Sequence, residues 1–183
     1  MTINNIILGS RAFGLAHQQV SFFGREIQAV PPNDNHMFEA ISRQLEPLRC
    51  TAQQLRAYLF HRGYANVNKY RRLHSKFGGR EGFLNQLLLL QTNGFWTARC
   101  ESLVIEILSN ELATKIVVVQ KDLRPVHYPH DNIEVRDEDI VLVKDHNSES
   151  HFDATSKRED ENGGKYSTFY DFTNSILRLS SHC

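Results

Sequence analysis

The stretch Val30–Leu45, VPPNDNHMFEAISRQL, decides the fold of this chain, because a strand, a corner and a helix meet within it. Pro31 and Pro32 lack a backbone donor and hold φ fixed, so the short apolar strand over 26–30 must stop there. The polar corner over 33–36 suits a tight turn, since Asn and Asp side chains bond to their own backbone. The stretch therefore predicts a strand-to-helix junction.

The helix after this corner has one apolar face, made of Met37, Phe38, Ile41 and Leu45. His36 stands where the helix begins, at its positive end and beside backbone N–H groups that lack a partner within the helix. Enzymes often place a nucleophile at such a position, because the local field stabilises a thiolate or an oxyanion. Here the residue at that position is a histidine.

The composition is that of an ordinary globular domain. At 183 residues the chain is long enough for one domain with a sizeable core, and 40% hydrophobic and 23% charged residues fit this class. A formal net charge of zero argues against nucleic acid or an anionic membrane as the partner. The longest apolar run is the leucine stretch over 87–90, far short of the roughly 20 residues that a membrane span needs.

The cysteines and the N-terminus bear on the cellular compartment. Cys50, Cys100 and Cys183 are odd in number and widely spaced, which fits a reducing compartment and excludes a CxxC metal or redox motif. The N-terminal residues lack the basic and apolar regions of a secretory signal. We therefore expect a cytoplasmic protein, or one delivered to a host cytoplasm by another route.

The middle of the chain predicts a series of helices. Thr51 and Gln54 form a capping box that begins one helix, and we expect Gly63 to end it. The last helix of the series should turn its acidic side chains Glu101, Glu106 and Glu111 toward solvent. The helical segments after the first are expected over 69–77, 81–91 and 99–112.

The last third of the chain predicts strands. The β-branched runs over 115–120 and 139–144 do not alternate with polar residues, which predicts strands buried on both faces. Residues 151–155 can form another strand, and the Pro- and His-rich segment 124–132 between the runs predicts a loop. A strand, several helices and then strands predict an α+β fold, in which helices sandwich a small twisted β-sheet.

The same patterns divide the chain into three parts. An extension over 1–24 carries short apolar runs and should pack on the core. The main domain is expected over 25–155. The remainder, 156–183, begins as a charged, flexible linker and ends in an aromatic and aliphatic segment that can dock back on the domain.

Two motifs of the chain resemble the OTU (ovarian tumour) family of cysteine proteases, which are mostly deubiquitinases. The family's opening motif, D-G-N-C-L-F-R-A, is matched by residues 33–40, NDNHMFEA, where Asn35, Phe38 and Ala40 agree outright. Its closing motif, H-[YFW]-[DN] after an apolar strand, is matched by His151-Phe152-Asp153. A Gly-Phe-Trp segment over 94–96, a helix with Glu101 and the strand over 116–119 lie between them in the family's order.

This resemblance implies an OTU-like fold of the papain-related cysteine protease superfamily, no cofactor, and ubiquitin or a ubiquitin-like protein as the partner. It makes His36 the nucleophile position, which is Cys in the family, His151 the general base and Asp153 its orienting acid. The backbone of the corner would stabilise an oxyanion, and two aromatic residues would form the wall of the cleft. The corner residues are Asn33, Asp34 and Asn35, and the wall residues are Trp96 and Phe152.

Three departures from the opening motif fall together, with Asn33 for Asp, Asp34 for Gly and His36 for Cys. Asp34 adds a side chain where the backbone approaches the substrate. Imidazole cannot replace a thiolate in forming a thioester, and it attacks amides poorly. The three cysteines of the chain lack the strand-to-corner context, so the motif predicts a catalytically impaired domain, a pseudo-deubiquitinase.

A histidine at position 36 is also compatible with three alternatives. A deliberate replacement of a natural cysteine would make the parent chain an active deubiquitinase, and a scaffold without ubiquitin binding is a second alternative. A metal site is a third, because His36, His151 and Asp153 could supply three ligands, although we predict none.

The remaining histidines and charges predict little chemistry. His127 and His130 fit a surface loop better than a metal site, and His146 lacks the aromatic-acid pair that follows His151. The basic helix over 69–76 is best interpreted as a solvated face.

Overall fold

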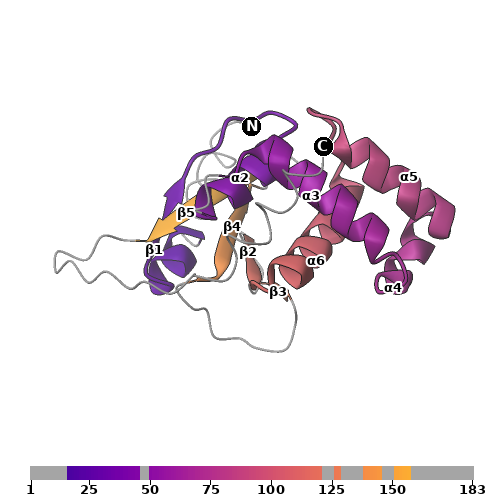
Figure 1. Ribbon diagram of the computed structural model, residues 1–183. Coiled ribbons are helices and arrows are strands. Elements are labelled where there is room, and N and C mark those ends of the chain that lie inside the picture. The colour runs from indigo at the N-terminus through magenta and orange to yellow at the C-terminus, as the bar shows by residue number, and fades with distance from the viewer. Residues whose placement is uncertain (1–15, 46–49, 121–125, 129–137, 146–150, 158–183) are drawn as a thin grey trace, which may run out of the picture.

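The computed structural model describes residues 16–45, 50–120, 126–128, 138–145 and 151–157. These residues form a sheet at one end of the molecule and a group of helices at the other, as Figure 1 shows. Some predictions fall on residues outside the described part of the chain: the first 15 residues of the predicted extension, most of the predicted 124–132 loop, His130, His146 and the segment 158–183.

Within the described residues, five strands form one sheet in the spatial order β1-β5-β4-β2-β3. The two central strands, β4 and β2, run parallel, with Ile116 opposite Ile140 and Val119 opposite Val143, and the other pairs are antiparallel. The bounds are Arg25–Gln28 for β1, Ile116–Gln120 for β2, Val126–Tyr128 for β3, Ile140–Asp145 for β4 and His151–Lys157 for β5.

The helices follow the predicted order. Thr51 caps α3 as a capping box: its Oγ1 accepts from the Gln54 N–H at 3.2 Å, and Gln54 Oε1 accepts from the Thr51 N–H at 2.8 Å. The bounds are 16–22 for the first helix, His36–Gln44 for α2, Ala52–Ala65 for α3, Arg71–His74 for α4, Arg80–Gln91 for α5 and Glu101–Leu112 for α6, with short 3₁₀ helices at Ser75–Phe77 and Ala98–Cys100.

Both faces of the central strands are covered, as their uninterrupted apolar sequence predicted. Alternate residues of β2 and β4 belong to two separate clusters, because successive side chains of a strand point to opposite faces. The face toward α2 and α6 carries Ile116, Val118, Ile140 and Leu142. The other face packs Val117, Val119, Val141 and Val143 against Ala16 and Val20 of the first helix.

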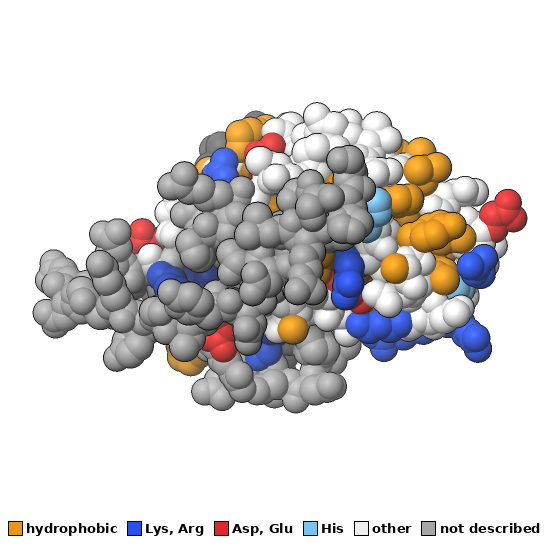
Figure 2. Space-filling view, viewed as in Figure 1, with side chains coloured by type: hydrophobic (Ala, Val, Ile, Leu, Met, Phe, Trp, Pro, Cys, Tyr) orange, Lys and Arg blue, Asp and Glu red, His pale blue; other side chains and the backbone are white. Residues whose placement is uncertain are grey.

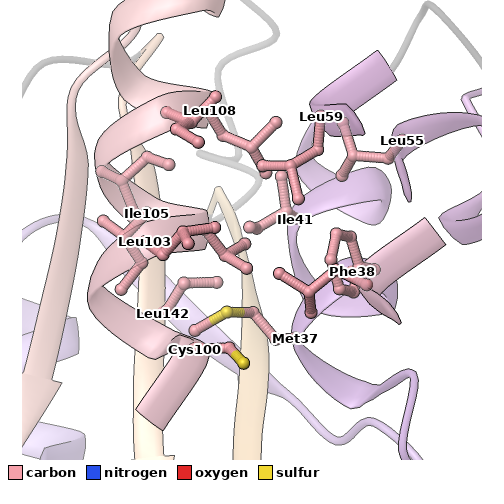
Figure 3. Close-up of a cluster of buried hydrophobic side chains, with 14 of the residues drawn as sticks. Met37, Phe38, Ile41, Leu55, Leu59, Cys100, Leu103, Ile105, Leu108 and Leu142 are labelled. Carbon is pink, nitrogen blue, oxygen red and sulfur yellow. The ribbon is translucent and has the colours of Figure 1, made fainter. Parts of the chain in front are cut away.

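The larger cluster is the main core of the domain. Figure 3 shows side chains of α2 and α3 facing those of α6, with Leu142 of β4 beside them. Met37, Phe38 and Ile41 of α2 are completely buried there. Burial of one such side chain stabilises a fold by about 1.5–3 kcal/mol, so the apolar face of α2 fixes the helix on the sheet.

Two predictions were wrong, one about Gly63 of α3 and one about the glutamates of α6. Gly63 does not end α3, which runs to Ala65, but lies where a Cβ atom would be 2.9 Å from Leu87 Cδ1. The acidic side chains of α6 do not face solvent: Glu111 is 2% exposed and is paired with Arg62 and Lys69. Glu101 and Glu106 are likewise paired, with Lys144 and Arg72.

The strands also differ from the sequence prediction: β1 spans Arg25–Gln28 and not 26–30, and β4 spans Ile140–Asp145 and not 139–144. The short strand β3 lies within the segment predicted as a loop, and its residues pair with β2. Strand β5 continues to Lys157, two residues beyond the expected end, because Ser156 and Lys157 pair with Glu26 and Arg25.

The surface of the helical end is mixed in character. Figure 2 shows hydrophobic side chains exposed over α5 and basic side chains near α4. Leu88 and Leu89 of α5 are 55% and 47% exposed. Among the described helices, none combines the length and the apolar content needed to cross a membrane.

Gly82 of α5 provides a test of this packing. A Cβ atom there would overlap the Phe77 carbonyl oxygen, which belongs to the backbone and cannot rotate away. We expect Gly82→Ala to lower the free energy of unfolding by about 1–3 kcal/mol, despite the higher helix propensity of Ala. Urea denaturation measures this, with the exposed Asn85→Ala on the same helix as the control; equal midpoints would contradict the packing.

Candidate active site

The corner before α2 is folded by its own hydrogen bonds. The Asn33 N–H donates to the Pro31 carbonyl at 2.8 Å, and the Asn35 N–H donates to Asn33 Oδ1 at 2.8 Å. The His36 N–H donates to the Asn33 carbonyl at 3.0 Å. These turns set His36 as the first residue of α2. They also engage the N–H groups of Asn35 and His36, so the oxyanion role of the corner stays a prediction.

A buried arginine of α3 holds the 33–36 corner in place through hydrogen bonds. Arg56 of α3 is 0% exposed, and its guanidinium donates to the Asp34 carbonyl at 2.7 Å and to Asn35 Oδ1 at 3.0 Å. The same group donates to the carbonyls of Leu90 at 2.7 Å and Phe95 at 2.9 Å. Burial lowers the pKa of Arg56 to about 10, so the group is still charged at neutral pH.

Asn35 extends this anchor to the loop that carries Trp96. Its Oδ1 also accepts from the Gly94 N–H at 3.2 Å, and its Nδ2 donates to Asn93 Oδ1 at 2.9 Å. Gly94 has a φ of 75°, a conformation that favours glycine. The corner and the loop are therefore held at a fixed distance from each other.

His151 and Asp153 form a hydrogen-bonded pair on β5. His151 Nε2 and Asp153 Oδ1 are 3.1 Å apart, and the same oxygen accepts from the Val30 N–H at 2.9 Å. Because an ionised carboxylate only accepts, the proton of a neutral His151 is on Nε2 and its Nδ1 carries a lone pair. The expected base and orienting acid are thus brought together.

The His151 ring lies next to His36. The two ring centroids are 5.2 Å apart with an interplanar angle of 57°. The nucleophile position of the family motif therefore faces the base position across the junction of α2 and β5.

Two aromatic rings surround His36 on its other sides. Trp96 meets it edge-on at 5.3 Å, and Phe152 stacks on it at 5.9 Å. Phe152 is 0% exposed and contacts His36 within the core, and its role as a cleft wall stays a prediction. Trp96 is half-buried, which is compatible with a wall.

Burial makes His36 a neutral imidazole. It is 5% exposed, and its pKa is lowered from 6.5 to about 4, first by burial and then by His151 and Arg56, against the opposing charges of Asp34 and Asp153. Desolvation costs an ionised group more than a neutral one, so the ring has no charge at neutral pH. A neutral ring gains little from the positive end of α2, unlike a thiolate.

No described cysteine takes over the nucleophile's position. Cys100 is completely buried, with its Sγ 2.9 Å from Gln86 Nε2 and 3.0 Å from Thr97 Oγ1. Burial raises the pKa of the Cys100 and Cys50 thiols, which keeps them protonated. Cys183 lies outside the described residues.

The three-ligand metal alternative is not supported. In the part of the chain that the structure describes, no three His, Cys, Asp or Glu side chains are placed to share an ion. Asp153 Oδ1 instead faces His151 Nε2 and the Val30 N–H. His127 lies on β3, and His130 and His146 lie outside the described residues.

The sequence prediction missed Arg56 and Asn93. Arg56 shares the buried face of α3 with Leu55, Leu59 and Gly63. A charged residue at an apolar helical position is the signal that could have identified Arg56 as an internal anchor. Asn93 carried no comparable signal, because turn residues such as Thr92-Asn93-Gly94 are common wherever a helix ends.

Comparison with known proteins identifies the fold. No protein-family model and no curated protein matches the sequence. Among solved structures, the OTU domain of OTUD1 matches with a TM-score of 0.63 and 14% identity, over 83% of this chain and 99% of that one. An OTU deubiquitinase from Wolbachia pipientis wMel matches with a TM-score of 0.59 and 17% identity, over 74% and 90% of the two chains.

A third structure, an OTU domain in complex with ubiquitin, matches with a TM-score of 0.57 and 16% identity, over 86% of this chain and 85% of that one. The chain therefore has the OTU fold, which confirms the α+β class and the resemblance that the two motifs indicated. At these identities the similarity establishes the fold alone.

Replacement of Arg56 tests the anchor. Arg56→Met removes a buried cation and leaves acceptors of the corner and of the 90–95 loop without their donors. We expect the free energy of unfolding to fall by at least about 3 kcal/mol. The exposed Arg71→Met is the control and should change it by less than about 0.5 kcal/mol in the same denaturation experiment. Equal effects of the two substitutions would contradict the anchor.

The lowered pKa of His36 predicts a dependence of stability on pH. Between pH 6.5 and 4 the unfolded chain binds a proton on this residue and the folded chain does not, so its contribution is present above pH 6.5 and is lost as the pH falls toward 4. Between pH 7 and 4 the wild type should lose about 3 kcal/mol more than His36→Gln. His61→Gln, at an exposed site, should follow the wild type; parallel curves for all three would refute the assignment.

Proposed function

We propose that this chain is a pseudo-deubiquitinase, an OTU-fold domain that lacks isopeptidase chemistry and acts by binding ubiquitin or a ubiquitin-like protein. The observation that carries the first part is His36, a buried neutral imidazole at the start of α2 that faces the His151–Asp153 pair. The pair has the arrangement of a base with its orienting acid. The group on which it would act in the OTU mechanism is a thiol, and here it is an imidazole.

The chemistry of the two side chains supports the loss of activity. A cysteine at a helix N-terminus is deprotonated easily, and its thiolate forms a thioester that hydrolysis then releases. Burial holds His36 as a neutral imidazole, and imidazole attacks amides poorly and forms no thioester. The Asn35 and His36 N–H groups donate within the corner, which removes two donors from an oxyanion site.

Two structural neighbours support ubiquitin as the kind of partner. One is an OTU domain in complex with ubiquitin, and the other is the Wolbachia deubiquitinase bound to ubiquitin. Binding requires surface complementarity and no reacting group, so a domain of this fold can bind the partner without cleaving it. The exposed leucines Leu88 and Leu89 offer apolar surface of the kind that partners cover.

An electrophilic ubiquitin probe tests the proposal. Ubiquitin with a vinyl electrophile at its C-terminus should leave the wild type unlabelled and should label His36→Cys, since a thiol there lies beside the base. His36→Cys combined with His151→Ala is the matched control and should lose most of the labelling. Intact-mass spectrometry in a Cys50→Ser background measures it; labelling of the wild type would refute the proposal.

The binding part has a separate readout. Titration of isotope-labelled ubiquitin with the wild-type chain should shift a contiguous set of ubiquitin resonances in NMR spectra. The absence of any shift at about millimolar concentration, where even weak interfaces are populated, would instead favour a scaffold without ubiquitin binding.

A further inference from the structure

Three buried nitrogen atoms without a hydrogen-bond partner among the described residues gather around His36. They are His36 Nδ1, His151 Nδ1 and Trp96 Nε1. The rings of His151 and Trp96 lie 5.2 and 5.3 Å from that of His36. A buried polar atom without a partner is costly to a fold, so three in one place indicate a site for a ligand that they share.

The chemistry of these atoms restricts the ligand. His151 donates its Nε2–H to Asp153, which leaves the lone pair of Nδ1 directed elsewhere. His36 Nδ1 is likewise buried and has no hydrogen-bond partner among the described residues. Two imidazole lone pairs are ligands for a transition metal, and imidazole nitrogen suits zinc, copper and nickel.

We propose that His36 and His151 bind a late first-row divalent metal ion, such as Cu²⁺ or Zn²⁺, through their Nδ1 atoms. This proposal does not depend on whether the domain binds ubiquitin. Asp153 supports the ion from outside the coordination sphere, because metal-binding histidines usually donate their other ring N–H to a carboxylate. The Val30 N–H in turn holds that carboxylate in place.

The separation of the rings agrees with a shared ion. A histidine nitrogen lies about 2.0–2.1 Å from zinc, which puts two ring centroids about 5 Å apart at a tetrahedral angle. The observed separation is 5.2 Å. An ion with two protein ligands completes its coordination with water or an anion, and the Trp96 N–H, which has no partner among the described residues, can donate a hydrogen bond to that group.

The only tryptophan of the chain makes the experiment direct. Trp96 lies 5.3 Å from His36, so bound Cu²⁺ should quench its fluorescence. We expect saturable quenching with a midpoint of about 1–10 μM and one ion per chain, reversed by excess Zn²⁺. His36→Asn and His151→Asn should each weaken binding at least about 10-fold, and Asp153→Asn about 10-fold.

The control variant is His61→Asn, which replaces an exposed histidine of α3 and should bind as the wild type does. Quenching that is the same in all variants, or that does not saturate below about 1 mM, would overturn the proposal. Electron paramagnetic resonance of the Cu²⁺-loaded wild type tests the same site and does not depend on the folding of any variant. Hyperfine coupling to two imidazole nitrogens supports the site, and its absence refutes it.

Discussion

The buried guanidinium of Arg56 is the interaction on which the site depends. A completely buried cation persists only when its donors are satisfied, and those of Arg56 reach the corner at Asp34 and Asn35 as well as the carbonyls of Leu90 and Phe95. Its guanidinium also lies 4.1 Å from the Phe38 ring centroid. One side chain of α3 thus fixes the start of α2 and the loop of Trp96, so the geometry around His36 is a property of the core.

This dependence explains which parts the sequence could predict. The capped start of α3 and the central strands follow local rules, since a capping box and an uninterrupted β-branched run act within a few residues. Gly63, Glu111 and Arg56 were missed because their roles come from partners on other elements. Gly63 makes room for Leu87, Glu111 receives Arg62 and Lys69, and Arg56 binds two loops. Short strand β3 was missed because only its pairing with β2 makes it a strand.

The sequence could predict which residues form the candidate site, but not their burial or their protonation. Sequence motifs named His36, His151 and Asp153, and the fold brings them together at the junction of α2 and β5. Burial, however, is a tertiary property. It covers the Phe152 ring completely and lowers the pKa of His36 to about 4, and no local pattern could indicate either effect. The same burial favours an uncharged side chain at position 36, because a neutral ring is tolerated where a charged group would be costly.

The pairing of His151 with Asp153 is by itself weak evidence for catalysis. Asp153 Oδ1 also accepts from the Val30 N–H, so the carboxylate ties β5 to the end of the stretch that leads into the corner. A structural role of this kind accounts for Asp153 and for the orientation of the His151 ring. It does not account for the Nδ1 of His151, which is buried and has no partner among the described residues. Since an unmet buried nitrogen is costly and the rest of the pair is satisfied, function in this domain is to be sought at that atom and at its neighbour in His36.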